Sequence, residues 1–142
     1  MIIFSERLKD LEKENNSQKA LLNFLNIRDN TIFYAWINNK KGITLENAYL
    51  IAKFYKCSMD YLFGRTEETK EIKHNKAPNF SKFLKIILDR QKVTQYRLCK
   101  DCNISSSSIY NWTHDIVNPN MSSIIKIADY LQVSIDYLVG IE

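Results

Sequence analysis

Glycine and proline are scarce in this chain, with three glycines and two prolines among 142 residues. Tight turns between strands rely on these two residue types, so their scarcity favours helices joined by short connections. The glycines also stand far apart, which leaves no glycine-rich phosphate-binding loop. Because 45% of the residues are hydrophobic, the chain can nevertheless form a folded core.

Long apolar runs are absent as well. No stretch approaches the roughly 20 residues that a membrane helix needs, and the apolar start of the chain is too short for a signal peptide. We therefore expect a cytoplasmic protein that does not associate with membranes. Three cysteines form an odd set, which in that compartment indicates reduced thiols.

Residues that could carry catalysis are few. His74 and His114 are the only histidines, and neither has the sequence neighbours of a triad or an acid–base pair. Cys99 and Cys102 have the spacing of a metal or redox pair, but zinc needs four ligands and no second pair follows. We therefore predict no enzymatic activity, no metal site and no cofactor.

The charge of the chain is only mildly basic, with a formal net charge of +4. Residues 1–69 contain ten Lys/Arg and nine Asp/Glu, whereas residues 70–142 contain ten and seven. Such a balance permits a nucleic-acid partner without requiring one, because an ordinary soluble surface accounts for it equally well.

The sequence contains an internal repeat. A shift of 76 residues places Trp36 on Trp112, and a shift of 77 places Gln18 on Gln95. One extra residue therefore enters the second copy before Gln95, and another enters the first copy between residues 27 and 36. We predict a divergent first domain at residues 1–65 and a second domain at residues 80–142. The polar linker between them, residues 66–79, could be partly helical over residues 67–73.

Apolar spacing and capping residues predict five helices in each copy, and so an all-α fold. Asn26 and Asn103 follow the second helix of each copy, where Asn tolerates the left-handed backbone of a sharp turn. Gly64 and Gly140 terminate the last helix of each copy. The candidate N-cap residues are Ser17, Thr44 and Ser58 in the first copy and Thr94, Asn120 and Ser134 in the second.

The second and third helices of the second copy have the spacing of a closely crossing pair. Counted from Gln95, the small residue Cys99 is fifth and Asn103 is ninth. Ile104, Ile109 and Trp112, at the tenth, fifteenth and eighteenth positions, form an inward stripe that locks the two helices together. This geometry leaves the third helix projecting, with its N-terminal end able to enter a DNA major groove.

This pattern resembles the Cro/CI-type (XRE) helix-turn-helix family of phage repressors and bacterial regulators. The resemblance covers residues 80–140 well, including the ending Ser134–Leu138, and covers residues 4–64 less well. It implies two lambda-repressor-like domains in tandem and a sequence-specific, repressor-like transcriptional regulator. It also implies a phage or prophage setting, and places the third helix of each domain in the major groove.

The resemblance further assigns DNA contacts residue by residue. The start of the second helix would touch phosphate, and the exposed side of the third helix would contact base edges, with Asn111 suited to adenine. The contacts expected in the second copy are Gln95, Ser105, Ser106, Ser107, Tyr110, Asn111 and His114. Those expected in the first copy are Gln18, Arg28, Asn30, Thr31, Tyr34, Asn38 and the phosphate-binding Lys40 and Lys41.

Two features keep other interpretations open in the second copy. The serine run could be only a helix cap and a solvated face. No Arg or Lys lies on the third helix, so electrostatic affinity would have to come from residues such as Lys92, Arg97 and Lys100.

The first copy departs from the pattern in two places. Leu22 occupies the fifth position, where a small residue is expected, and either Ile32 or Phe33 could take the fifteenth, with Trp36 then nineteenth. If Leu22 forces the helices apart, this copy would bind DNA poorly and could dimerise or bind a protein. The alternative function is thus a protein-interaction module, such as a phage-encoded inhibitor of a host nuclease or an anti-repressor.

The expected partner is double-stranded DNA, bound by a homodimer on a palindrome. Two domains in one chain raise a second arrangement, in which one chain covers both half-sites as a pseudo-dimer. A linker of about fifteen residues would span half-sites about 34 Å apart.

Overall fold

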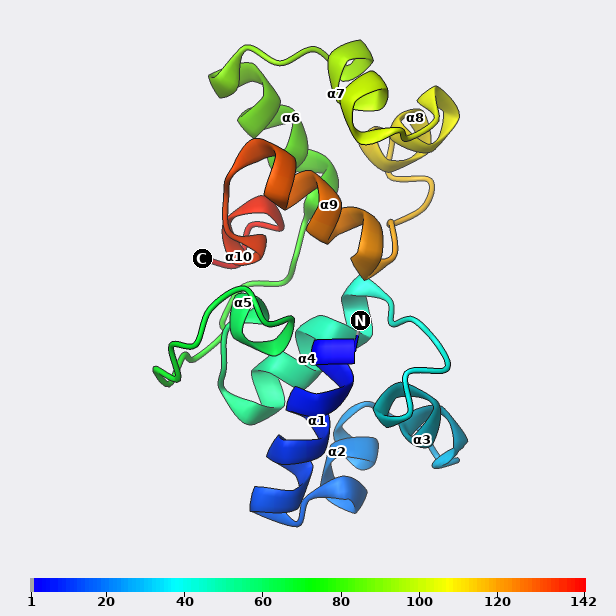
Figure 1. Cartoon of the computed structure of the whole chain (residues 1–142), viewed down its shortest axis with the longest axis vertical. Helices are drawn as coiled ribbons and strands as arrows, with labels where there is room; N and C mark the ends of the chain where they lie inside the picture. The colour runs from blue at the N-terminus through cyan, green and yellow to red at the C-terminus, as the bar shows by residue number, and fades with distance from the viewer. Residues whose placement is uncertain (1) are drawn as a thin grey trace. The chain divides into compact units, whose positions relative to one another are not determined.

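Ten α-helices form the regular structure of the chain in the computed structural model, which describes residues 2–142 (Figure 1). They divide between two compact units, Met1–His74 and Asn75–Glu142. No strand occurs in the described residues, which confirms the predicted all-α class. Within the same residues, no helix combines the length and the apolar character needed to cross a membrane.

In both units a long first helix is followed by two short helices, a longer fourth helix and a single-turn fifth helix. The first unit contains α1 (Ile2–Asn15), α2 (Gln18–Phe24), α3 (Thr31–Ile37), α4 (Leu45–Tyr55) and α5 (Met59–Leu62). The second contains α6 (Phe80–Gln91), α7 (Gln95–Cys102), α8 (Ser106–Thr113), α9 (Met121–Leu131) and α10 (Ile135–Leu138).

Each unit has its own apolar core, to which all five of its helices contribute. The first helix packs against the third and the fifth, and the second packs against the fourth, in both units. A buried serine on the first helix holds the end of the third: Ser5 Oγ donates to the Trp36 carbonyl, and Ser81 Oγ donates to the Thr113 carbonyl at 3.0 Å. The third helix is thereby fixed on one face only.

Side-chain caps begin five of the helices as the sequence predicts. Thr44, Ser58, Thr94, Asn120 and Ser134 each accept a hydrogen bond from the backbone N–H three residues later. The prediction is wrong for Ser17, which precedes α2 but makes no side-chain cap bond. Its hydroxyl lies 2.8 Å from the Tyr55 hydroxyl instead, so a tertiary contact has replaced the local cap.

Two asparagines have the left-handed backbone that the sequence predicts for them. Asn26 and Asn103, after the second helix of each unit, have φ of 59° and 54°. Gly64 and Gly140 end the last helices with φ of 77° and 80°. A Cβ atom on Gly140 would lie 2.2 Å from the Phe83 ring, so this position requires glycine for space as well as for backbone conformation.

The segment between the predicted domains is not helical, and the expectation of helix over residues 67–73 is wrong. Its backbone instead contacts the first unit, where the Ile72 N–H donates to the Lys56 carbonyl at 2.9 Å. The first unit therefore includes residues 66–74, which the sequence analysis assigned to the linker. Tertiary hydrogen bonds satisfy backbone groups that a helix would have satisfied locally.

The cap on α7 gives a testable stability difference. Thr94→Ala should lower the free energy of unfolding of the second unit by about 1 kcal/mol, because the Arg97 N–H loses its acceptor. Thr94→Ser, which keeps the hydroxyl, should retain most of that stability. Each unit holds one of the two tryptophans, so a Trp36→Phe background lets Trp112 fluorescence report urea unfolding of the second unit alone. Equal stability of the two variants would contradict the cap.

Candidate nucleic-acid interface

The connection between α7 and α8 forms a tight crossing in the second unit. Asn103 turns the chain in the left-handed conformation, and the Ile104 N–H donates to the Cys99 carbonyl at 3.0 Å. Ile109 and Trp112 are buried, with 1% and 8% of their surface exposed, as the inward stripe predicts. Ile104, the third residue predicted for the stripe, is only half-buried, and so is Cys99. The crossing holds α8 by one face and leaves the other in solvent.

The start of α8 presents hydroxyl groups to solvent. Ser105 is the N-cap: its Oγ accepts from the Ser108 N–H at 3.1 Å and donates to Ser108 Oγ at 2.8 Å. Within the serine run, Ser105 therefore acts as the helix cap. Ser106 and Ser107 are exposed in the first turn, where the backbone N–H groups of the helix also point outward.

Tyr110 and His114 form an exposed aromatic pair at the other end of α8. Their rings stack at 3.9 Å between centroids and 22° between planes, and Tyr110 is 54% exposed. The His114 Nδ1 lies 2.8 Å from the Tyr110 carbonyl, which can only accept a hydrogen bond, so Nδ1 carries the proton. In the neutral ring Nε2 is then an acceptor. Asn111 lies half-buried between these residues in sequence.

The cations expected near this face differ in whether a carboxylate offsets their charge. Lys92 and Lys100 are exposed, but Arg97 pairs with Asp101 at 3.1 Å from Nε to Oδ2. The Tyr130 hydroxyl also donates to the same carboxylate oxygen. The hydrogen bonds from Tyr130 and then Arg97 lower the pKa of Asp101 below its ordinary value. Asp101 is thus ionised at neutral pH and offsets the charge of Arg97.

The first unit accommodates its extra residue in the turn between α2 and α3. That connection runs over residues 25–30, whereas the corresponding connection in the second unit runs over residues 103–105. Phe33 is buried and Ile32 is half-buried, so Phe33 takes the inward position that the sequence left undecided. Leu22 is buried, with 7% of its surface exposed.

A carboxylate stands at the start of α3 in the first unit. Asp29 Oδ1 accepts from the Thr31 N–H at 3.0 Å and from the Thr31 hydroxyl at 2.8 Å. These two hydrogen bonds lower the pKa of Asp29. The Thr31 hydroxyl is therefore committed locally, and a negative charge occupies the place that Ser105 and Ser106 hold in the second unit.

The other predicted contacts of the first unit are spread along one side of it. Gln18, Arg28 and Asn30 line an open hollow of about 930 Å³, and the Tyr34 hydroxyl lies 3.5 Å from Gln18 Oε1. Asn38 follows α3, and Lys40 and Lys41 are exposed in the connection to α4. In the second unit, Gln95 is the counterpart of Gln18. It is exposed and is the first residue of α7.

Sequence reasoning missed three exposed apolar residues in the second unit: Tyr96, Ile116 and Val117, with 74%, 60% and 53% of their surface exposed. The repeat contained a signal for two of them. Under the shift of 76, Ile116 and Val117 replace Lys40 and Lys41, so a basic loop in one copy is apolar in the other.

Metal-binding groupings are not evident in the part of the chain that the structure describes. No three His, Cys, Asp or Glu side chains gather within residues 2–142 in a way that could hold an ion. Cys99 and Cys102 are free thiols there.

Comparison with known proteins finds a family model that matches part of the chain. A helix-turn-helix family model matches residues 84–138, which lie in the second unit and include both α7 and α8. This family is one of DNA-binding regulators. No curated protein and no solved structure matches the chain.

The stacked pair on α8 predicts one tautomer of His114. We expect nitrogen-15 NMR at mildly alkaline pH to show the proton on Nδ1, because the Tyr110 carbonyl accepts from that atom. His74 serves as an internal control, because its Nε2 lies 2.6 Å from the Cys57 carbonyl and should carry the proton. A His114 ring protonated mainly on Nε2 would contradict the geometry of the pair.

Proposed function

We propose that the chain is a sequence-specific DNA-binding transcriptional regulator of the XRE type, whose principal DNA-reading element is α8. The observation that carries this proposal is the α7–α8 crossing, which buries Ile109 and Trp112 and leaves a polar face of α8 exposed. The match of residues 84–138 to the helix-turn-helix family supports it. A helix held in this way can lie in the major groove, where base pairs are distinguishable.

The exposed residues of α8 divide by chemistry. Ser106 and Ser107 suit phosphate or base contacts at the start of the helix, because hydroxyls both donate and accept. Asn111 can form two hydrogen bonds to adenine. Tyr110 and His114 offer an apolar stacked surface with polar edges, which suits contact with thymine methyl groups. Gln95, at the start of α7, is placed for phosphate.

The first unit contributes differently in this proposal. Asp29 places a negative charge at the start of α3, which disfavours close approach of that end to phosphate. Lys40 and Lys41, in contrast, are exposed and suit the DNA backbone. We therefore assign the stronger base recognition to the second unit and a weaker half-site, held largely by Lys40 and Lys41, to the first. The chain would act as a homodimer or, with both units on DNA, as a tandem pseudo-dimer.

A second candidate function is protein interaction. In the first unit, Phe33 and Trp36 are buried in the core and offer no surface for it. The observation that favours it is instead the exposed Ile116–Val117 loop beside α8. Exposed apolar neighbours of this kind occur at protein interfaces, and such a surface could serve an inhibitor or an anti-repressor.

Salt-dependent DNA binding tests the regulator function. Fluorescence anisotropy on random and genomic DNA should show affinity that falls as salt rises, because Lys and Arg displace counterions from phosphate. Asn111→Ala should relax base choice at one position by about 1–3 kcal/mol, whereas Lys41→Ala should weaken binding to all sequences alike. Equal effects of both variants on every sequence would contradict the assignment, and no binding at low salt would favour the protein-interaction function.

The Arg97–Asp101 pair predicts a variant that binds DNA more tightly. Asp101→Asn should raise affinity for random DNA and steepen its salt dependence by about one phosphate contact, because Arg97 no longer faces a carboxylate. Asp89→Asn removes the same charge from α6 and corrects for the change in net charge. An Asp101→Asn variant that behaves like Asp89→Asn would show that Arg97 lies away from the DNA.

A further inference from the structure

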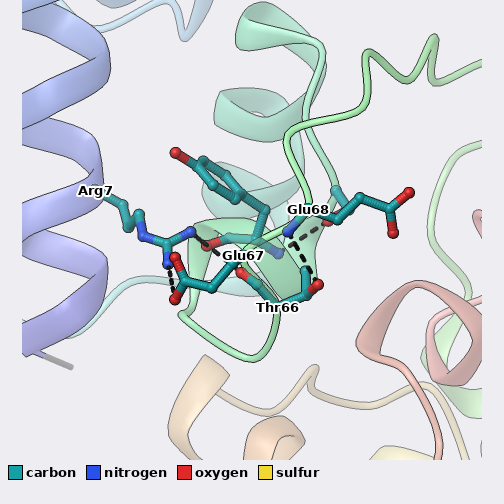
Figure 2. Close-up of polar contacts among 6 residues, drawn as sticks. Arg7, Thr66, Glu67 and Glu68 are labelled. Carbon is teal, nitrogen blue, oxygen red and sulfur yellow. Dashed lines mark hydrogen bonds and ion pairs between the residues drawn. The ribbon is translucent and has the colours of Figure 1, made fainter.

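Residues 65–74, which we term the strap, follow α5 within the first unit, and Arg7 holds their beginning (Figure 2). From α1, Arg7 Nη1 donates to the carbonyls of Tyr61 and Thr66 at 2.9 and 3.3 Å, and Nη2 reaches Glu67 Oε1 at 2.9 Å. The guanidinium carbon also lies 4.0 Å from the centroid of the Tyr61 ring. Because Glu67 is exposed, the two carbonyl contacts and the ring matter more than the ion pair.

The end of the strap is held by a buried histidine. His74 is 5% exposed, its Nε2 lies 2.6 Å from the Cys57 carbonyl, and its ring meets the Tyr49 ring edge-on at 5.8 Å. Two residues earlier, the Ile72 N–H donates to the Lys56 carbonyl at 2.9 Å. These two acceptors directly follow α4, so the strap is hydrogen-bonded to the connection between α4 and α5.

The internal repeat indicates that Arg7 is particular to the first unit. Under the shift of 76 its counterpart is Phe83, whose ring packs over Gly140. The neighbouring core positions Phe4 and Leu8 keep their character as Phe80 and Leu84. The copies thus differ at the position from which Arg7 holds the strap in the first unit.

Docking of the strap shortens the connection between the two units. Asn79 already belongs to the second unit, since its N–H donates to the Val139 carbonyl at 2.8 Å and its side chain caps α6. The connection is then residues 75–78, with a reach from His74 to Asn79 of about 17 Å. With the strap released, the chain from Arg65 to Asn79 could extend over about 48 Å.

We infer that the docked strap determines the spacing of DNA half-sites that the two units can occupy together. This inference rests on the proposed function, in which both units contact DNA. A second unit tethered by a short connection gains effective concentration only at sites that the connection can reach. Half-sites at a matching spacing are bound more tightly than either alone, whereas half-sites placed further apart lose that gain.

Docking can be tested without DNA. The Ile72 amide should exchange with deuterium slowly in the whole chain, because the Lys56 carbonyl accepts its hydrogen bond. Arg7→Ala combined with His74→Ala should make that exchange many times faster, while amides in the core of α4 stay protected. Lys70→Ala removes the same charge as Arg7→Ala from an exposed strap position and should change nothing. Rapid exchange at Ile72 in the unaltered chain would overturn the inference.

Spacing is tested on DNA that carries the two preferred half-sites, obtained by selection from random sequence. The half-sites are separated in single-base-pair steps over about two helical turns. The unaltered chain should show one narrow optimum at which affinity exceeds that for a single half-site by about 10²-fold or more. The Arg7→Ala/His74→Ala chain should spread that gain over longer spacings.

An insertion provides a second variant that leaves the strap contacts intact. Several Gly-Ser residues added between Lys76 and Ala77 lengthen the connection without altering any docked residue, and should broaden the optimum in the same direction. Half-sites bound singly with no preferred spacing would overturn this inference and leave the proposed function standing. If the chain bound no half-site while the Ile72 amide stayed protected, both this inference and the proposed DNA-binding function would be overturned.

Discussion

The burial of Ile109 and Trp112 on one face of α8 is the interaction on which the remaining structure of the second unit depends. These side chains hold α8 against α6 and α7, and the Ser81 hydroxyl fixes its last carbonyl. Because α8 is held through its buried apolar face, its polar face needs no partner within the chain. The left-handed turn at Asn103 keeps the connection between α7 and α8 short at this crossing.

The same arrangement in the first unit carries a different surface. Phe33 is buried and holds α3 as Ile109 holds α8, yet the start of α3 bears the Asp29 carboxylate where α8 begins with serines. After the third helix, two lysines in the first unit correspond to Ile116 and Val117 in the second. Conserving the inward residues of a repeat while changing the outward ones is how one fold supports two tasks.

The strap connects this division to the organisation of the chain. A polar segment without an apolar period has little surface to bury, so its place depends on specific polar contacts. Arg7 and His74 supply them through hydrogen bonds to the carbonyls of Tyr61, Thr66 and Cys57. These contacts also limit the length of free chain that connects the second unit to the first.

Much of the structure of this protein follows from local interactions that can be identified in its sequence. Capping side chains, the left-handed Asn26 and Asn103, and the periodic apolar residues act within a few positions of themselves, so the helices and the inward Trp112 could be predicted. The tertiary structure decided the remaining features. These are the choice of Phe33 over Ile32, the Ser17 bond to Tyr55, the Arg97–Asp101–Tyr130 cluster and the docking of residues 66–74. Each depends on partners far apart in the chain or on how a longer turn is absorbed, and residue spacing alone contains neither.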